Sequence, residues 1–541
     1  MRRLSLRLPN RLFVLFVLAL LVLGAGCHGF SGPTPTPFAE QISSNSEGEA
    51  EPEATPTLEM AEAALTAETA SDEEPDGDEI EVPPASDTPE KPDASETKVT
   101  PEPTGKPTRT PPPTATPIPS TTPTSAPQFA PVLQIQEPQP VREGVSTPAT
   151  AIPTAVPEFT IPKGTTNILL LGSDEPVGDG GVKRTDTMII VSVDPDGPTA
   201  SMISLPRDLY VYIPGGTMSR LNSAVTLGGI ELLKQTILYN FGVPIHYYAQ
   251  VDFQGFEDVV DAIGGVEVAV SCPFKDWRIK SPELDPEDED NWYVFELEPG
   301  IYEMDGDTAL WYARSRLMSN DFDRGRRQQQ LLRAMLNQGV KLDLVPQVPV
   351  LWNSYKDSVE TDMDIGRMLQ IASLAPAILE NGVQNLYLMG KTESWIVPDT
   401  NAQVQLPIWE GPGNMSDTFQ RLFLPPALNK ANRAPIEVEI VNASGNEELP
   451  RLAAENLAWH GFVPVINDEE MPEKKITTLT YFGPNFKGSY DWLISWIFHL
   501  RQSDVVLNDE DTEFSYNYQV VLGQDFDPCL NELFAPQSFL P

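Results

Sequence analysis

Arginines gather in one short stretch of an otherwise acidic chain. The chain carries a net charge of -42 at pH 7, yet guanidinium groups recur from position 314 onward. The cluster consists of Arg314, Arg316, Arg324, Arg326, Arg327 and Gln328. A planar guanidinium presents paired N–H donors to phosphate oxygens, so a dense arginine cluster is typical of a phosphate or pyrophosphate site. The alternative is a solvated helix face neutralised by Asp321 and Asp323, and we expect it for Arg326.

A second group of charged residues lies at the ends of predicted strands. Asp174 follows the first apolar run, Arg184 and Asp186 precede the second, and Arg207 follows the third. In an α/β protein, strand ends at one sheet edge are where ligands bind. Asp174 and Asp186 are candidate ligands for Mg²⁺, which takes a few carboxylates together with water and substrate phosphate oxygens.

Alternating strands and helices must hold these residues in place. Short β-rich runs at 167–171, 188–193 and 201–205 predict strands. Apolar residues at helical spacing follow at 230–241 and 253–263, and a further strand is expected at 266–270. This pattern predicts an α/β fold with helices layered on a sheet.

A smaller α/β domain is expected at 436–523. Strands are predicted at 436–441, 462–466, 478–482 and 519–522, with helices at 449–460 and 490–500. The roughly 380 residues after position 158 are enough for two domains by the usual size range, so we place the first domain at 164–425.

The N-terminal segment 1–27 has the features of an export signal. Four arginines precede an apolar run that is shorter than the ~20 residues a spanning helix needs. Small residues then lead to Cys27, as in a bacterial lipobox, which predicts lipidation of Cys27. An uncleaved membrane anchor is the alternative. Both place the protein at the extracytoplasmic face of the cell membrane.

Residues 28–158 are rich in Pro, Thr, Ser and Glu and have no apolar periodicity. Such a segment buries too little surface to offset its conformational entropy, so we expect a long disordered linker. Much of the acidity lies in this linker. We expect no nucleic-acid partner.

The cysteines and histidines do not indicate a metal or catalytic site. Three cysteines are present, and after Cys27 only Cys272 and Cys529 remain. A bridge between them is chemically permitted outside the cytoplasm, but sequence alone leaves the pairing open. Four scattered histidines argue against a histidine-based metal site.

The charged residues also fall within a series of short motifs in a fixed order. The motifs are Gly172-Ser-Asp174, Arg184-Thr-Asp-Thr187, Leu205-Pro-Arg-Asp208, Arg220-Leu-Asn-Ser-Ala224, Gly264-Gly-Val266, Ala313-Arg-Ser-Arg316 and the stretch from Asp321 to Gln328. Across 166–338 this series resembles the LytR–CpsA–Psr family of bacterial cell-wall glycopolymer ligases. Residues 436–523 resemble the LytR C-terminal domain that often follows.

The resemblance implies a central mixed sheet flanked by helices and an extracytoplasmic phosphotransferase. Such an enzyme moves a glycopolymer from a polyprenyl-pyrophosphate carrier onto peptidoglycan, with Mg²⁺ on the pyrophosphate and the lipid tail in an apolar pocket. Asp174 and Asp186 match the metal-associated acids, and Asp186, Arg184 and Arg207 the catalytic positions. The pyrophosphate-contacting set is Arg184, Arg207, Arg220, Arg314, Arg316, Arg324, Arg327 and Gln328.

Two departures from the family pattern concern the site. Arg220 stands where the family usually has lysine, which keeps the charge and changes the hydrogen-bond geometry. An acidic insert lies between Lys275 and Asn291. Two other functions remain open: a Mg²⁺-dependent pyrophosphatase acting on lipid-linked pyrophosphates, and a non-catalytic envelope protein that binds wall polymer.

Overall fold

The computed structural model describes residues 150–529, except 174–184, 282, 318, 357, 399, 412–413, 429–433, 470, 483–489 and 509–514. Cys27, Asp174, Arg184 and the linker up to position 149 therefore lie outside the described residues. Within the described part, no helix is both long and apolar enough to cross a bilayer.

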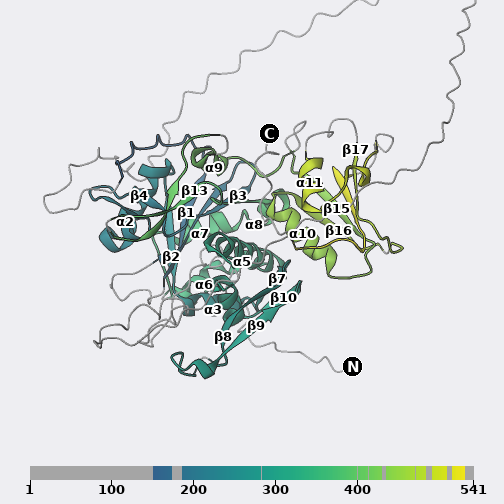
Figure 1. Cartoon of the computed structure of the whole chain (residues 1–541), viewed down its shortest axis with the longest axis horizontal. Helices are drawn as coiled ribbons and strands as arrows, with labels where there is room; N and C mark the ends of the chain where they lie inside the picture. Colours follow the sequence, from purple (N-terminus) through teal and green to yellow (C-terminus); the bar gives the residue numbers. More distant parts are fainter. Residues whose placement is uncertain are drawn as a thin grey trace, which may run out of the picture. The chain divides into compact units, whose positions relative to one another are not determined.

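A six-stranded mixed sheet forms the centre of the first domain (Figure 1). In spatial order its strands are β11 (Val359–Thr361), β6 (Tyr247–Val251), β1 (Thr166–Ser173), β2 (Thr185–Asp194), β3 (Thr199–Ser204) and β12 (Val383–Leu386). β1 pairs with β2 in antiparallel and with β6 in parallel orientation. Every residue of β1 is buried, as expected for a strand covered on both faces. The three predicted strands and the mixed sheet are confirmed.

Helices cover both faces of this sheet, because side chains alternate between the faces along each strand. Ile168 and Leu170 of β1 pack in one core, while Leu169 and Leu171 pack in the other. The first core is built with α3 (Phe253–Ala262), α4 (Gly306–Arg314), α5 (Asp321–Lys341), α6 (Val348–Tyr355), α7 (Ile365–Ala372) and α8 (Ala375–Asn381). The second is built with α2 (Ser223–Phe241) and α9 (Met415–Arg421).

The folded region begins before the predicted end of the linker. Val156 and Phe159 donate backbone hydrogen bonds to Tyr239 and Gly242, both at 2.9 Å. The Tyr239 hydroxyl also donates to the carbonyl of Pro153 at 2.9 Å. Residues 153–158, which the sequence assigned to the linker, thus lie against the end of α2.

Among the described residues, four short two-stranded ribbons lie outside the central sheet of the first domain. They are β4 (Tyr210–Tyr212) with β5 (Met218–Arg220), β7 (Val266–Val270) with β10 (Gly300–Met304), β8 (Phe274–Ile279) with β9 (Trp292–Leu297), and β13 (Thr392–Ile396) with β14 (Gln403–Pro407). Two short 3₁₀ turns, η1 (Glu289–Asn291) and η2 (Val345–Gln347), complete the first domain.

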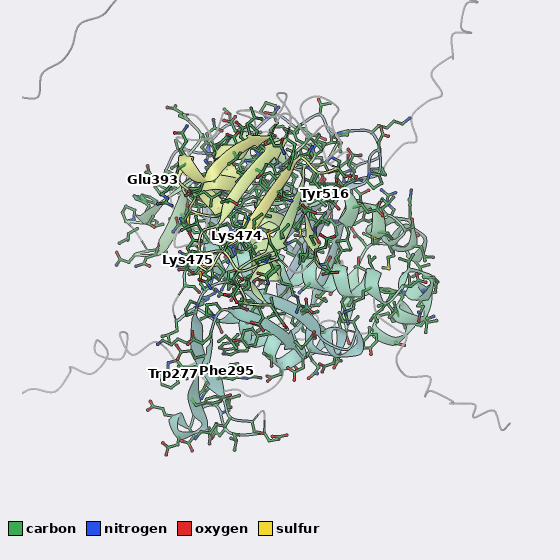
Figure 2. All side chains as sticks on the ribbon, turned by 90° about the vertical axis from the view of Figure 1, so that its right-hand side faces the viewer. Trp277, Phe295, Glu393, Lys474, Lys475 and Tyr516 are labelled. Carbon is green, nitrogen blue, oxygen red and sulfur yellow. A yellow bond between two sulfur atoms is a disulfide. The ribbon has the colours of Figure 1, made fainter. Side chains whose placement is uncertain are left out.

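The acidic insert forms the β8–β9 hairpin, on which Trp277 and Phe295 are labelled in Figure 2. Trp277 is 52% exposed. At the base of the hairpin, the Asp276 carboxylate accepts from the backbone amides of Arg316 and Leu317, at 2.5 and 3.1 Å. The hairpin is therefore anchored to the loop that carries part of the arginine cluster.

The C-terminal module is a separate five-stranded sheet with two helices. Its strands lie in the order β16 (Val463–Asn467), β15 (Glu437–Asn442), β19 (Tyr518–Leu522), β17 (Thr478–Phe482) and β18 (Val505–Asn508). Its helices are α10 (Leu449–Trp459) and α11 (Asp491–Ile497), and the 3₁₀ turn η3 (Gln502–Asp504) precedes β18. The predicted elements all appear, and β18 is an additional strand.

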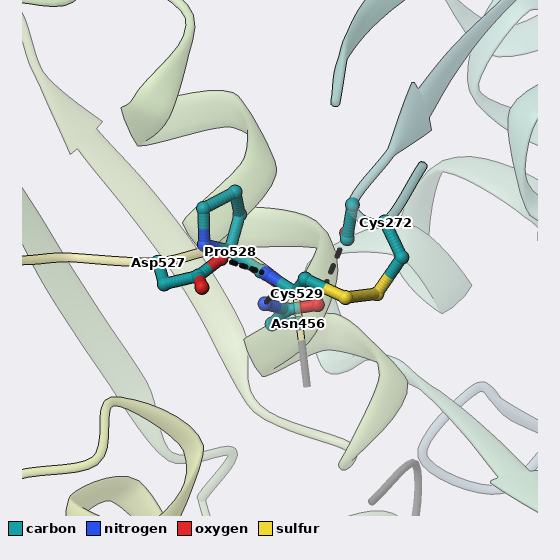
Figure 3. The surroundings of a disulfide bond; sticks show 6 residues. Cys272, Asn456, Asp527, Pro528 and Cys529 are labelled. Atoms are coloured by element: carbon teal, nitrogen blue, oxygen red, sulfur yellow. Dashed lines mark hydrogen bonds between the residues drawn. A yellow bond between two sulfur atoms is a disulfide. The ribbon is translucent and has the colours of Figure 1, made fainter. Parts of the chain in front are cut away.

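A disulfide and buried polar contacts join the C-terminal module to the first domain. Cys272, just after β7, is bonded to Cys529 near the end of the described chain (Figure 3). Beside the bridge, Ser271 donates to the Asn456 side chain at 3.2 Å. The pairing that sequence left open is therefore formed.

Candidate functional site

Asp186 and Arg207 face each other from neighbouring strands. Asp186 is the second residue of β2, and Arg207 follows the end of β3, which pairs with β2 in antiparallel orientation. Arg207 Nη1 donates to both carboxylate oxygens of Asp186, at 2.8 Å each. Burial alone would lower the pKa of Arg207, but the hydrogen bond and charge of Asp186 raise it. Asp321 and Asp208 act in the same direction.

Asp208 is a half-buried acid at this edge. Burial and the nearby charge of Asp321 raise the pKa of Asp208, while Arg207 and Arg220 partly oppose them. One of its oxygens, Oδ1, is buried and has no hydrogen-bond partner among the residues the structure describes. Asp208 therefore has an oxygen that no described cation contacts directly.

Helix α5 begins next to this pair, and its start is fixed by a capping box. The Asn320 side chain accepts from the amides of Phe322 and Asp323, and the Asp323 side chain accepts from the Asn320 amide. These contacts satisfy amides that a helix start leaves unpaired. Gly325 then lies directly on β3, since a Cβ there would come within 2.9 Å of the Ser204 side chain. Only glycine permits this close approach.

Arg324 and Gln328 occupy one face of α5 at a spacing of four residues. The Arg324 side chain is 8% exposed and forms an ion pair with Asp321 at 3.3 Å. It also donates to the backbone carbonyl of Asp186 at 3.3 Å. Gln328 donates to the Thr187 hydroxyl at 2.9 Å. The sheet edge and the helix start thus bring Asp186, Arg207, Arg324 and Gln328 together.

Two further predicted arginines, Arg316 and Arg220, act on acids of this centre, and a third, Arg314, lies against α3. Arg316 is 41% exposed and lies 3.8 Å from the Asp321 carboxylate. Arg220, at the end of β5, donates to the carbonyl of Gln403 at 2.9 Å and acts electrostatically on Asp208. Arg314, at the end of α4, stacks its guanidinium 3.7 Å from the centroid of the Phe253 ring.

Arg327 has a different role from the one its place in the cluster suggested. Its Nε donates to the Tyr312 carbonyl at 2.9 Å, and its Nη2 donates to the Ser315 carbonyl and the Ser319 hydroxyl. The guanidinium also lies over the Phe274 ring, and burial lowers the pKa of Arg327. Arg327 lies about 100° around the helix from Gln328, and its guanidinium is directed to Tyr312, Ser315 and Ser319. We place it among the residues that stabilise the fold.

Arg326 also departs from its expectation. The sequence favoured a solvated position neutralised by Asp321 and Asp323, but those two acids serve Arg324, Arg316 and the helix cap. The Arg326 guanidinium instead lies 5.4 Å from the ring centroid of Trp459, in the C-terminal module. Cation–π contacts act over this range.

A pocket adjoins the Asp186–Arg207 pair. Asp186, Ser204, Arg324, Gln329 and Trp459 are among its lining residues. The sequence reasoning missed Gln329 and Trp459. Gln329 directly follows Gln328, which the sequence did indicate, so it could have been included. Trp459 could not, because no sequence pattern relates a residue of the C-terminal module to a site in the first domain.

The magnesium site stays a prediction. No group of three or more Asp, Glu, His or Cys side chains suited to a metal ion is found there. Mg²⁺ often binds through one or two carboxylates together with substrate phosphates. Asp186, a partly exposed carboxylate at the sheet edge, fits that mode of binding.

Fold and site together define an α/β protein whose sheet edge gathers arginines and acids suited to a phosphate ligand. The model of the LytR_cpsA_psr family matches residues 143–407. The chain belongs to this family. The C-terminal module lies beyond the matched residues, so its likeness to the LytR C-terminal domain stays a prediction.

Several known proteins are similar to the chain. It is 32% identical over 240 residues to the polyisoprenyl-teichoic acid–peptidoglycan teichoic acid transferase TagU of Oceanobacillus iheyensis, covering 43% of this chain and 69% of that protein. The probable cell wall biosynthesis protein LcpB of Corynebacterium glutamicum is 38% identical over 187 residues, covering 32% and 41%. The crystal structure of Bacillus subtilis TagV aligns with a TM-score of 0.40 at 26% identity, covering 48% and 97%.

Proposed function

We propose that this protein is a phosphotransferase that attaches a glycopolymer, carried on a polyprenyl pyrophosphate, to peptidoglycan. The observation that carries the proposal is the convergence of Asp186, Arg207 and Arg324 at one sheet edge. Family membership supports it, as do relatives named for teichoic acid transfer to peptidoglycan.

The reaction would form one phosphate ester and break one pyrophosphate bond. A sugar hydroxyl of the acceptor attacks the phosphorus that carries the glycopolymer. The P–O bond to the second phosphate breaks, which releases polyprenyl phosphate. The hydroxyl proton passes to a carboxylate, and Asp186 is the described acid at this position. Phosphoryl transfer requires mainly positioning and charge neutralisation from a protein.

The arginines would supply both the positioning and the charge neutralisation. Arg207 and Arg324 are held by Asp186 and Asp321, so their guanidinium groups are oriented before a ligand arrives. Such preorganised donors stabilise developing charge without reorganisation during the reaction. Arg316 is the more exposed partner and would contact the ligand from the solvent side.

Mg²⁺ is part of the proposal. Asp186 would hold it together with pyrophosphate oxygens, and Asp174, which lies outside the described residues, would join as a second carboxylate. When bound, the ion would neutralise charge on the leaving phosphate. We also propose that Cys27 is lipidated after export, which would hold the protein at the outer face of the membrane.

Transfer can be tested with the full chain in detergent and a labelled polyprenyl-pyrophosphate saccharide as donor. Soluble peptidoglycan fragments serve as acceptor, and both labelled glycan product and free saccharide phosphate are measured. Labelled product that depends on the acceptor supports the ligase. Saccharide phosphate without glycan product would indicate a lipid pyrophosphatase, and neither product would indicate a non-catalytic binding protein.

A further inference from the structure

Arg316 lies on the loop between α4 and α5, and its backbone is held from both sides. Its amide donates to the Asp276 carboxylate at 2.5 Å, and its carbonyl accepts from the Ser319 amide at 3.0 Å. Its side chain then extends to within 3.8 Å of Asp321, at the start of α5. The rotamers open to a side chain depend on its backbone angles, so these two hydrogen bonds restrict where the Arg316 guanidinium can lie.

Asp276 uses both carboxylate oxygens to accept from backbone amides. Oδ2 accepts from Arg316 and from Leu317, at 2.5 and 3.1 Å, and Oδ1 accepts from Trp277 at 2.7 Å. Hydrogen bonds from an amide to an ionised carboxylate are stronger than those between neutral groups. Two of the three amides belong to the loop that carries Arg316. Asp276 is therefore a direct link between the β8–β9 hairpin and this loop.

The hairpin is fixed firmly enough to support the loop. Phe295, the cross-strand neighbour of Asp276, packs edge-on against the Trp311 ring of α4, with the centroids 4.9 Å apart. Phe274 contacts the same ring at 5.5 Å, and Trp311 Nε1 donates to the carbonyl of Trp277 at 3.0 Å. Helix α4 thus holds the hairpin, and the hairpin in turn holds the loop that follows α4.

Arg327 holds the same loop at different points. It donates to the Ser315 carbonyl and to the Ser319 hydroxyl, which lie on either side of Arg316 in the chain. Asp276 contacts Arg316 itself. The ends of the loop therefore depend on α5, whereas its centre depends on the hairpin. This division separates contacts that stabilise the fold from a contact that orients the side chain of Arg316.

We propose that Asp276 is a positioning residue for pyrophosphate binding, because it holds Arg316 where the guanidinium meets a ligand phosphate from the solvent side. The inference rests on the proposed transfer function. By its charge alone, a carboxylate near the site would repel a pyrophosphate, and its removal would tighten binding. A role through Arg316 predicts the opposite sign, so the direction of the change distinguishes the two. Asp276 lies in the acidic insert, and the proposal gives a function to one of the acids of that insert.

Binding can be measured by calorimetry on the full chain in detergent, with a short-chain prenyl pyrophosphate and Mg²⁺. We expect Arg316→Ala to weaken binding about ten-fold and Asp276→Ala about five-fold, because a mobile Arg316 still reaches the ligand part of the time. Asp276→Asn keeps one accepting oxygen, so its affinity should fall between those of Asp276→Ala and the wild type. In transfer assays the donor KM should rise, while the acceptor KM stays unchanged.

A double variant tests whether Asp276 acts through Arg316. Substitutions that act through one contact are not additive, so Asp276→Ala combined with Arg316→Ala should bind within about two-fold of Arg316→Ala alone. An Asp276 that only stabilised the fold would lower the melting temperature without this coupling. Glu296→Gln is the matched control, because it removes one carboxylate from the same hairpin, where Glu296 is 49% exposed and 3.9 Å from Lys275. Its affinity should stay within about two-fold of the wild type.

Unchanged or tighter binding in Asp276→Ala would overturn the proposal. Wild-type affinity in Arg316→Ala would do the same, because Asp276 would then have no arginine to act through. An undiminished further loss on adding Asp276→Ala to Arg316→Ala would also overturn it. If Asp276→Ala fails to fold, Asp276→Asn and its double variant with Arg316→Ala provide the same comparison.

Failure of the proposed function gives a different pattern. If the two substitutions are coupled in binding but no glycan product forms, the role of Asp276 stands and the transferase fails. If glycan product forms and the donor KM is the same in the wild type and in Asp276→Ala, the transferase stands and the role of Asp276 fails.

Discussion

Arg207 uses a single nitrogen, Nη1, to contact both oxygens of the Asp186 carboxylate at 2.8 Å. Among the described residues the other nitrogens of its guanidinium have no hydrogen-bond partner, and they can meet a ligand because the group carries five donors. The pair therefore combines internal orientation with a free binding face. The same carboxylate would serve as a metal ligand or as a base. Alternatively, it only holds Arg207 in position, and substitution of Asp186 distinguishes these roles.

Asp186→Asn should abolish transfer and remove the Mg²⁺-dependent part of pyrophosphate binding. The amide keeps the shape of the side chain but loses its charge and its basicity. Titration of the wild type and the variant with pyrophosphate, with and without Mg²⁺, measures this. Asp194→Asn, at the other end of β2, is the control. Tighter metal-free binding with transfer retained would mean that Asp186 only braces Arg207.

Arg324→Ala should weaken binding of the pyrophosphate lipid by roughly 2–5 kcal/mol, as for buried charge pairs elsewhere. The reason is that Arg324 is almost fully buried beside Asp186 and would leave the ligand phosphate unpaired. Arg316→Ala should have a smaller effect, since that side chain is much more exposed. Calorimetry with a soluble lipid analogue gives both values. Wild-type affinity in a folded Arg324→Ala variant would restrict Arg324 to its contact with Asp321.

Arg327→Met should act on stability and leave ligand affinity unchanged. The substitution removes the donors that satisfy the Tyr312 and Ser315 carbonyls, at a cost of roughly 2–3 kcal/mol. A melting curve together with a pyrophosphate titration checks both parts. A stable variant that no longer binds pyrophosphate would return Arg327 to the binding site.

Glu257 should make the protein less stable as the pH rises toward neutrality. Burial, followed by the charges of Asp307 and Asp261, raises the pKa of Glu257 to about 7. The folded state then holds a proton that the unfolded state releases near pH 4.5, so stability falls between about pH 4.5 and 7. Glu257→Gln should raise the melting temperature at pH 8 by a few degrees, about 1 kcal/mol after solvent screening. It should make little difference at pH 4.5, and an equal effect at both values would contradict the assignment.

Cys27→Ala should release the protein from the membrane or leave its N-terminal segment uncleaved. The motivation is the short apolar run and the small residues before Cys27. Fractionation and mass analysis of the mature N-terminus provide the measurement. Processing and membrane retention equal to the wild type would exclude the lipoprotein.

The sequence predicted most of what depends on local pattern. Strand β1 and the Gly264–Gly265 turn follow from apolar runs and turn residues that act within a few positions. The grouping of Asp186, Arg207 and Arg324 was predictable because strand ends and helix starts meet at a sheet edge. The individual directions of Arg326 and Arg327 were not predictable, since neighbouring helical side chains differ by about 100° and small errors in helix phase exchange their faces.

Contacts between the two modules could not be predicted from the sequence, for a different reason. The Trp459–Arg326 stacking and the bond between Cys272 and Cys529 join residues far apart in the chain. No local pattern encodes such distances, and disulfide pairing depends on the geometry of the finished fold. Only the structure shows that the C-terminal module reaches the edge of the candidate site.

The bond between Cys272 and Cys529 can form only after most of the chain has been synthesised. Its two cysteines are 257 residues apart, and ribosomes add residues at about 5–20 per second. Cys272 therefore waits on the order of tens of seconds for its partner to be synthesised. During that interval the first domain has a free thiol and an uncovered flank on α5. The contacts of Trp459 and Glu455 with α5 form only after the C-terminal module has been synthesised.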